Sequence, residues 1–155
     1  MSSPARRIEV MTADRATQEL IEAFARLLPQ LSASAAPLNL QSLGAIIEAS
    51  TNTVLIARDL SAGGRIVGTL TLVMFRIPTA VRAWIEDVVV DGEARGLGVG
   101  EALVSAAVNL GKQYGAKTID LTSRQSRQAA HRLYEKVGFH VRDTSVYRHG
   151  PKVGS

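Results

Sequence analysis

The sequence predicts an α/β protein of the α+β type, with a mixed but mostly antiparallel sheet of about six to seven strands and about four helices on its two faces. Thr53–Asp59, Ile66–Phe75 and Trp84–Val90 are β-rich apolar segments joined by short turns, so consecutive segments must pair antiparallel. Gly98–Tyr114 then carries apolar residues at helical spacing and leads to another strand, Lys117–Leu121. A helix between two strands indicates parallel pairing through a right-handed crossover.

The N-terminal part predicts one short strand and two helices. The strand is expected at Arg7–Met11, and Thr12 or Asp14 is expected to cap a first helix that ends at Pro29. Asn39 is the expected N-cap of the second helix. The apolar stripes of the two helices are Leu20, Phe24, Leu27 and Leu28, and Leu43, Ile46 and Ile47.

The C-terminal part predicts a short helix followed by two closing strands. The helix begins near Ser126 and ends at Gly138, and its apolar face is Ala130, Leu133, Tyr134 and Val137. Phe139–Val141 and Ser145–Tyr147 are short β-rich segments, so we expect them to complete the sheet.

The composition fits one domain that spans residues 1–155, because 46% of the residues are apolar and a chain of this length can bury a core. No apolar run approaches the roughly 20 residues of a membrane helix, and no apolar segment follows the N-terminal arginines as in a signal peptide. The absence of cysteine excludes disulfides, thiolate metal sites and a cysteine nucleophile. We therefore expect a cytoplasmic protein that binds no membrane.

The charge pattern argues against a nucleic-acid interface. The formal net charge of +4 is modest and spread along the chain, which favours an ordinary basic surface, although it would also suit a polyanionic ligand. The three histidines show no metal-ligand grouping, so no metal site is expected.

The segment from Arg95 to Gly100, with the sequence RGLGVG, is a glycine-rich turn between a buried strand and a helix. Such a turn presents free backbone N–H groups and the positive end of the helix dipole, which together make an anion site, most naturally for phosphate. Gly98 and Gly100 lack Cβ atoms, so a pyrophosphate can lie against bare backbone there. The alternative is a tight turn that binds nothing.

This turn also carries a family resemblance. It matches the [Q/R]-x-x-G-x-[G/A] acetyl-CoA signature of the GNAT N-acetyltransferases, with Arg95, Gly98 and Gly100 in the first, fourth and sixth places. A second segment, LYEKVGF at Leu133–Phe139, resembles the L-Y-E-K-x-G-F motif of the same family, with Tyr134 at the tyrosine place. Within the family, the IEDVVV strand and this helix are most similar to glucosamine-6-phosphate N-acetyltransferases.

The resemblance implies a GNAT enzyme that moves an acetyl group by direct transfer from acetyl-CoA, as co-substrate, to a primary amine without a metal. Backbone groups of Val88, Val89 and Val90 would face the pantetheine and the thioester. Arg127 stands where the family commonly has an asparagine that contacts pantetheine, so this contact is either lost or replaced by a charged contact of Arg127 to a CoA phosphate. The residues implied to bind the pyrophosphate are Arg95, Gly96, Leu97, Gly98, Val99, Gly100 and Glu101, the last also stabilising the helix start.

Three residues are the candidates for catalysis and acceptor binding. Glu86 and Asp87 are adjacent on the Trp84 strand, so regular alternation puts them on opposite faces. Two acids in a buried strand are costly unless they are used or paired. The resemblance implies that Glu86 is the general base, that Asp87 binds the acceptor and that Tyr134 protonates the leaving thiolate. The alternatives are that both acids pair with arginines and that Tyr134 is a core aromatic.

The acceptor is not identified by these residues. A small amine or an amino sugar is favoured, peptide amines remain open, and a homodimer is possible because the family commonly forms one. One different reading is a non-catalytic acetyl-CoA sensor or interaction domain. Another is a Rossmann oxidoreductase, which is disfavoured because the glycines are spaced G-x-G-x-G and follow an antiparallel meander.

Overall fold

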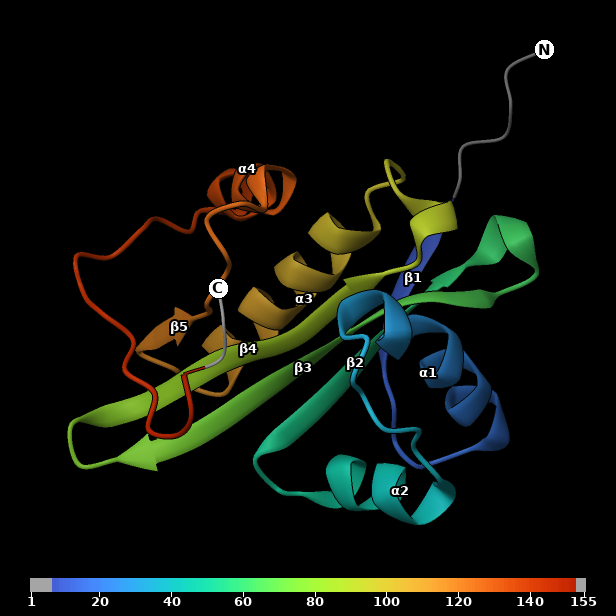
Figure 1. Ribbon diagram of the computed structural model, residues 1–155, viewed down its shortest axis with the longest axis horizontal. Coiled ribbons are helices and arrows are strands. Elements are labelled where there is room, and N and C mark those ends of the chain that lie inside the picture. Colours follow the sequence, from blue (N-terminus) through green and yellow to red (C-terminus); the bar gives the residue numbers. More distant parts are fainter. Residues whose placement is uncertain (1–6, 153–155) are drawn as a thin grey trace.

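The computed structural model describes residues 7–152, which form one sheet with helices on both sides (Figure 1). The strands are β1 (Ile8–Thr12), β2 (Asn52–Asp59), β3 (Arg65–Ile77), β4 (Ala80–Val90) and β5 (Thr118–Asp120). The helices are α1 (Gln18–Leu31), α2 (Leu40–Glu48), α3 (Val99–Gln113) and α4 (Gln128–Val137). Short 3-10 turns occur at Leu60–Ala62 and Gly92–Ala94.

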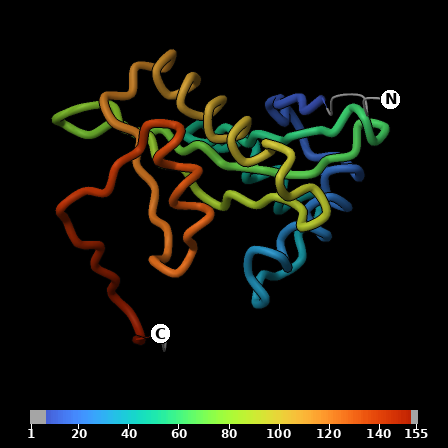
Figure 2. The backbone as a smooth tube through the Cα atoms, turned by 90° about the horizontal axis from the view of Figure 1, so that it is seen from above, coloured from blue at the N-terminus to red at the C-terminus, as the bar shows by residue number. Residues whose placement is uncertain are grey.

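The sheet has the predicted mixed topology. Its strands follow the order β1-β2-β3-β4-β5, and every neighbouring pair is antiparallel except β4 and β5, which are parallel. Figure 2 shows α3 on one side of the sheet and α1 and α2 on the other. The meander, the crossover through α3 and the helices on both faces are therefore confirmed.

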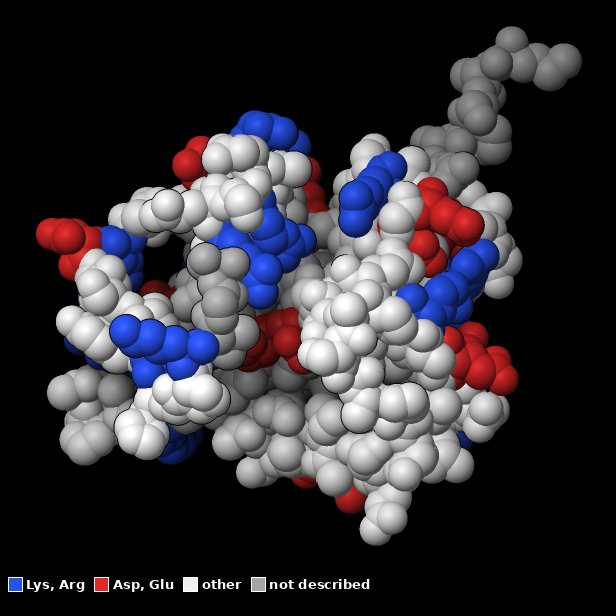
Figure 3. Space-filling view, in the orientation of Figure 1, with Lys and Arg blue, Asp and Glu red and all other residues white. Residues whose placement is uncertain are grey.

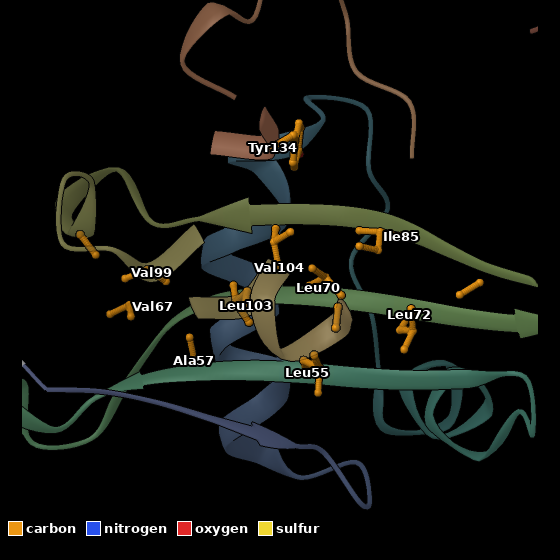
Figure 4. Packing of buried hydrophobic residues seen from close by; sticks show 13 residues of the cluster. Leu55, Ala57, Val67, Leu70, Leu72, Ile85, Val99, Leu103, Val104 and Tyr134 are labelled. Atoms are coloured by element: carbon orange, nitrogen blue, oxygen red, sulfur yellow. The ribbon is translucent and has the colours of Figure 1, made fainter. Parts of the chain in front are cut away.

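Two apolar clusters hold these layers together. Successive strand residues face opposite sides, so Leu55 packs in the cluster under α3 while Val54 packs in the cluster under α1 and α2. Figure 4 shows the α3 cluster, which includes Leu103 and Tyr134. Gly68 in β3 lets α3 come close, because a Cβ there would lie 2.9 Å from Cγ1 of Val99. The sheet thus fixes the first turn of α3, where the site begins.

The helix boundaries in the N-terminal part are only partly as expected. Asn39 caps α2 as predicted, with its Oδ1 accepting from the N–H of Ser42 at 2.8 Å. The cap of α1 is Thr17, so the prediction of Thr12 or Asp14 is wrong, because β1 extends further than expected. Pro29 does not end α1 but lies within its last turn, where it removes one N–H donor from the helical ladder and the helix ends two residues later.

The two predicted closing strands, Phe139–Val141 and Ser145–Tyr147, are wrong. Residues 139–152 form no strand or helix, so the described sheet has five strands instead of six to seven. Val141 and Tyr147 are 86% and 92% exposed. A strand needs a neighbour to pair with, and β5 offers an edge only three residues long. Within residues 7–152 no helix has the length and apolar character to cross a membrane.

Candidate functional site

The site lies where β4 and β5 separate. Their pairing runs only from Arg82 opposite Thr118 to Trp84 opposite Asp120. Beyond that point β5 has ended, so no described residue pairs with the β5 side of residues 85–90 in β4. The separation thus begins before the two acids, Glu86 and Asp87. Backbone N–H and C=O groups of β4 are thereby left available to a ligand.

An open groove of about 1250 Å³ lies between the separated strands and extends from the end of α1 to α4. It is larger than the roughly 300–1,000 Å³ typical of small-molecule pockets. Most of the residues singled out from the sequence line it, namely Glu86, Asp87, Val88, Val89, Val90, Arg95, Gly96, Gly98, Val99, Gly100, Glu101, Arg127 and Tyr134. Leu97 does not line the groove, because its side chain packs against the α3 cluster.

The glycines of the turn are required for different structural reasons. Gly96 and Gly98 adopt the left-handed region with φ of 78° and 80°, and a Cβ on either would meet nothing within 4 Å. Gly100 lies in α3, where a Cβ would come within 3.0 Å of Cδ2 of Leu133. Gly100 therefore permits close packing of α4 on α3, whereas Gly98 faces open space.

The first turn of α3 provides unused hydrogen-bond donors. Gly98 is its N-cap, and no side chain caps it. The first intrahelical acceptor, the carbonyl of Gly98, receives the N–H of Ala102, so the N–H groups of Val99, Gly100 and Glu101 have no place in the helical ladder. Together with the helix dipole they favour an anion at this end of the groove.

Four arginines line the groove: Arg95, Arg124, Arg127 and Arg148. Their side chains form no ion pair with a carboxylate of the described chain, and basic side chains gather over the α4 side of the molecule in Figure 3. Glu101 is compensated instead by Lys136 of α4, with an Nζ–Oε2 distance of 2.9 Å. Unpaired guanidinium groups are well suited to phosphate oxygens.

A β-bulge shapes the acidic part of the site. Thr69 pairs with Val89 and Thr71 with Glu86, so Leu70 faces two residues of β4 instead of one. Asp87 adopts a φ of 50°, the single positive φ among the described non-glycine residues. The left-handed backbone of Asp87 indicates that it is the inserted residue of the bulge. Strained backbone of this kind occurs often at functional sites.

The bulge overturns two expectations about the acids. Glu86 shares a face with Thr71, its cross-strand partner, and Asp87 lines a small cavity together with that same threonine. The two carboxylates therefore lie on the same face of the sheet instead of opposite faces. Both residues are exposed and not buried, and Figure 3 shows acidic side chains in the hollow between the α4 side and α1.

Neither acid is used in a structural ion pair. None of the salt bridges of residues 7–152 involves Glu86 or Asp87, and neither side chain accepts a hydrogen bond from that part of the chain. The alternative that both acids pair with arginines is therefore wrong. Two adjacent carboxylates without partners are available to a cationic ligand.

Tyr134 has both a packing role and access to the groove. Tyr134 is only 8% exposed, and its ring packs edge-on against that of Phe139 with the ring centroids 6.0 Å apart. Burial raises the pKa of Tyr134 above its usual range, and the charge of Arg127 acts in the opposite direction. The phenol thus stays protonated at neutral pH and lines the groove as a potential proton donor.

Sequence reasoning missed several lining residues. Ser123 follows β5, and its buried Oγ has no hydrogen-bond partner within residues 7–152. Its position outside the carboxyl end of a parallel strand is a signal that could have identified it. Arg124 follows directly, while Arg148 belongs to the C-terminal segment that was predicted to form a strand. An unpartnered buried hydroxyl in a groove is a place where a ligand atom fits.

No metal centre is indicated within the described residues, where no three His, Cys, Asp or Glu side chains are placed to hold an ion. A second, smaller cavity of about 130 Å³ lies between α1, α2 and the sheet. Asp87 lines both this cavity and the large groove, and no other residue of the described chain does. The site therefore consists of a long basic groove and a small cavity that meet at a carboxylate.

The profile of the acetyltransferase (GNAT) family matches residues 17–139. No curated protein matches the chain. A Trypanosoma brucei acetyltransferase is 25% identical, covers 92% of this chain and 99% of its own, and has a TM-score of 0.73.

Two other solved structures share the fold at lower identity. The glucosamine-6-phosphate N-acetyltransferase of Arabidopsis thaliana is 18% identical over 92% of this chain and 98% of its own, with a TM-score of 0.76. An aminoglycoside N-acetyltransferase in complex with CoA is 14% identical over 97% of this chain and 99% of its own, with a TM-score of 0.77.

Proposed function

The chain belongs to the acetyltransferase (GNAT) family, and we propose that it transfers an acetyl group directly from acetyl-CoA to a primary amine. The observation that carries this proposal is the convergence of three features in one groove. The first is the start of α3, which no side chain caps, with arginines around it that form no ion pair within residues 7–152. The second is the C-terminal half of β4, whose β5 side pairs with no described residue, and the third is the pair of carboxylates without partners in the same part of the chain. The first feature suits a polyphosphate, the second an acyl group and the third an amine.

Acetyl-CoA would supply the activated acyl group as a thioester. The N–H groups that follow Gly98, with the side chains of Arg95 and Arg127, would hold the phosphates. Backbone N–H groups of β4 at residues 88–90 would bind the thioester end and stabilise negative charge on its carbonyl oxygen. The open space beside Gly98 and the unpartnered Ser123 hydroxyl support this fit. The aminoglycoside acetyltransferase with the same fold was solved with CoA.

The carboxylates would prepare the amine. An alkyl amine with a pKa of about 10 is neutral in only about one molecule per thousand at pH 7, which costs roughly 4 kcal/mol. Glu86 would accept the ammonium proton directly or through water, and Asp87 would hold the amine beside the groove. The absence of a competing ion partner within residues 7–152 supports both roles.

Tyr134 would complete the reaction by giving a proton to the leaving thiolate. Because burial raises the pKa of Tyr134, its hydroxyl remains protonated over the neutral range. The leaving thiolate, whose conjugate thiol has a pKa of about 8.5, is basic enough to accept a hydrogen bond or a proton from this donor. The ring keeps its packing role against Phe139, so the two functions do not exclude each other.

A thiol-release assay with acetyl-CoA and a panel of primary amines tests the proposal. We expect CoA release that depends on the amine, with the acetylated amine identified by mass spectrometry. Calorimetry with acetyl-CoA measures donor binding separately. Tight acetyl-CoA binding without turnover of any amine would instead establish a sensor or interaction domain, and absence of both would remove the proposed function.

A further inference from the structure

The small cavity beside Asp87 has an apolar lining. It opens between α1, α2, β2 and β3, and its volume is about 130 Å³. Six aliphatic or aromatic side chains form most of its wall, namely Phe24, Leu28, Leu38, Leu43, Ile46 and Val54. No lysine, arginine, glutamate or amide side chain lines it. A cavity of this kind favours an apolar group of similar size.

The polar groups of the cavity are few, and they lie toward the sheet. Thr69 is buried, and its hydroxyl already donates to the carbonyl oxygen of Leu55 at 2.8 Å. Thr71 and Asp87 complete the lining. A ligand with several hydroxyls would lose its water here without finding enough partners, and each unmatched polar group opposes binding.

Asp87 marks the point where the cavity meets the large groove, because it lines both. The bulge of β4 lies at this residue, and Asp87 borders the cavity together with Thr69 and Thr71 of β3. A ligand with one positive charge next to an apolar body would therefore place the charge at Asp87 and the body among the aliphatic side chains.

We propose that the acceptor is a small primary amine attached to a ring or branched alkyl group of about six carbons, bound in the cavity formed by Phe24, Leu28, Leu38, Leu43, Ile46 and Val54 with its ammonium group at Asp87. The size follows from the volume, since apolar protein cavities of about 150 Å³ hold benzene. This inference rests on the proposed function and narrows its acceptor. It favours an apolar amine over an amino sugar.

Steady-state kinetics over an amine series test this directly. The series is methylamine, butylamine, isoamylamine, benzylamine and octylamine, with glucosamine, glucosamine 6-phosphate and spermidine as polar members. We expect kcat/KM to rise about fourfold for each added methylene, which is about 0.8 kcal/mol converted at 25 °C, and to fall for octylamine. Glucosamine and its phosphate should lie at least tenfold below benzylamine.

Two neighbouring residues of α2 provide a matched pair of variants. Ile46 and Ile47 are both half-buried and pack against the same cluster, but only Ile46 lines the cavity. Ile46→Phe should fill the cavity and lower the benzylamine-to-methylamine ratio of kcat/KM at least tenfold, whereas Ile47→Phe should leave this ratio unchanged. If Ile46→Phe does not fold, Ile46→Ala enlarges the same space and should move the optimum toward longer amines.

The outcomes separate the two proposals. Turnover of glucosamine 6-phosphate or spermidine in preference to benzylamine would overturn the apolar acceptor and leave acetyl transfer intact. Equal effects of Ile46→Phe and Ile47→Phe on the ratio would also overturn it. Failure to acetylate any amine, with acetyl-CoA bound or not, would overturn both. A chain-length optimum that shifts only with Ile46 supports the inference.

Discussion

Replacing Gly98 by alanine tests whether the glycine turn holds the phosphates of acetyl-CoA. Gly98 has φ of 80° and ψ of 13°, and a Cβ there would meet nothing within 4 Å. The substitution therefore creates no clash inside the protein. It does place an L-residue in the left-handed region, which costs about 1–2 kcal/mol. For a chain of this size that cost lowers Tm by about 2–8 °C.

Gly98→Ala should also lower the affinity for acetyl-CoA, by more than the cost of the backbone strain. The new methyl group occupies the open space beside donors that are proposed to hold the pyrophosphate. Loss of one hydrogen bond to a charged group costs about 1.5–3 kcal/mol, so the dissociation constant should rise about 10- to 150-fold. Calorimetry with acetyl-CoA and a thermal melt of the free protein measure the two effects separately.

Gly115 provides the matched control. It follows the other end of α3 with a φ of 83°, a Cβ there also meets nothing within 4 Å, and it does not line the groove. Gly115→Ala should lower Tm by a similar amount and leave acetyl-CoA affinity unchanged. If Gly98→Ala bound acetyl-CoA as tightly as Gly115→Ala, the phosphates would not rest on this turn.

Three further substitutions test Glu86, the Tyr134 phenol and the contact of α1 with Asp91, which follows β4. Glu86→Gln should lower kcat about 10²–10⁴-fold at neutral pH and flatten the acidic limb of the rate profile, with acetyl-CoA affinity unchanged by calorimetry. Tyr134→Phe should slow the chemical step about 10–10³-fold in single-turnover experiments. Because burial raises the pKa of Tyr134, the wild type should also lose stability as the pH rises above about 10, and this loss should be absent in the variant. Arg26→Met removes a 3.2 Å hydrogen bond to the buried Asp91, so urea unfolding should show a loss of about 1–3 kcal/mol, compared with less than about 1 kcal/mol for the more exposed Arg65→Met.

Each of these has a contrary result. An unchanged pH profile for Glu86→Gln would transfer the base role to Asp87 or to water. Equal single-turnover rates for Tyr134→Phe and wild type would show that Tyr134 serves only as a core aromatic. Burial pushes the pKa of Asp91 up, but hydrogen bonds from Glu93 N–H and Arg26 hold it below its usual range. The stability gained from Arg26 should therefore be complete at pH 7 and decline as the pH falls below about 4, and a pH-independent difference would refute this reasoning.

Local patterns in the sequence predicted most of the fold. The β-rich apolar runs of β2 and β3, the Asn39 cap and the helix before β5 each depend on neighbours close in the chain, and each is found in the structure. The closing strands failed because strand formation depends on a partner. The segment 139–147 has β-rich residues, but the short β5 edge does not pair with it.

Most residues singled out from the sequence line one groove, but the sequence did not predict the geometry of that groove. The glycine motif identified the turn from its residues, yet only the helix packing shows that Gly100 makes room for Leu133. Ser123 and Arg148 could not be assigned, because they reach the groove through the separation of β4 from β5 and through an irregular C-terminal segment. Spatial proximity between residues far apart in the chain produces no periodic pattern in the sequence.

The bulge in β4 explains why two adjacent acids can serve one site. In a regular strand, residues 85, 87 and 89 would share a face. Here Ile85, Val88 and Val90 pack in the α3 cluster, and Val89 packs under α1 and α2, so the alternation shifts by one residue at Asp87. The shift places the carboxylate of Asp87 on the same side as that of Glu86, where the groove and the small cavity meet. One inserted residue therefore places a second carboxylate at the proposed amine site while the flanking apolar residues keep their places in the two clusters.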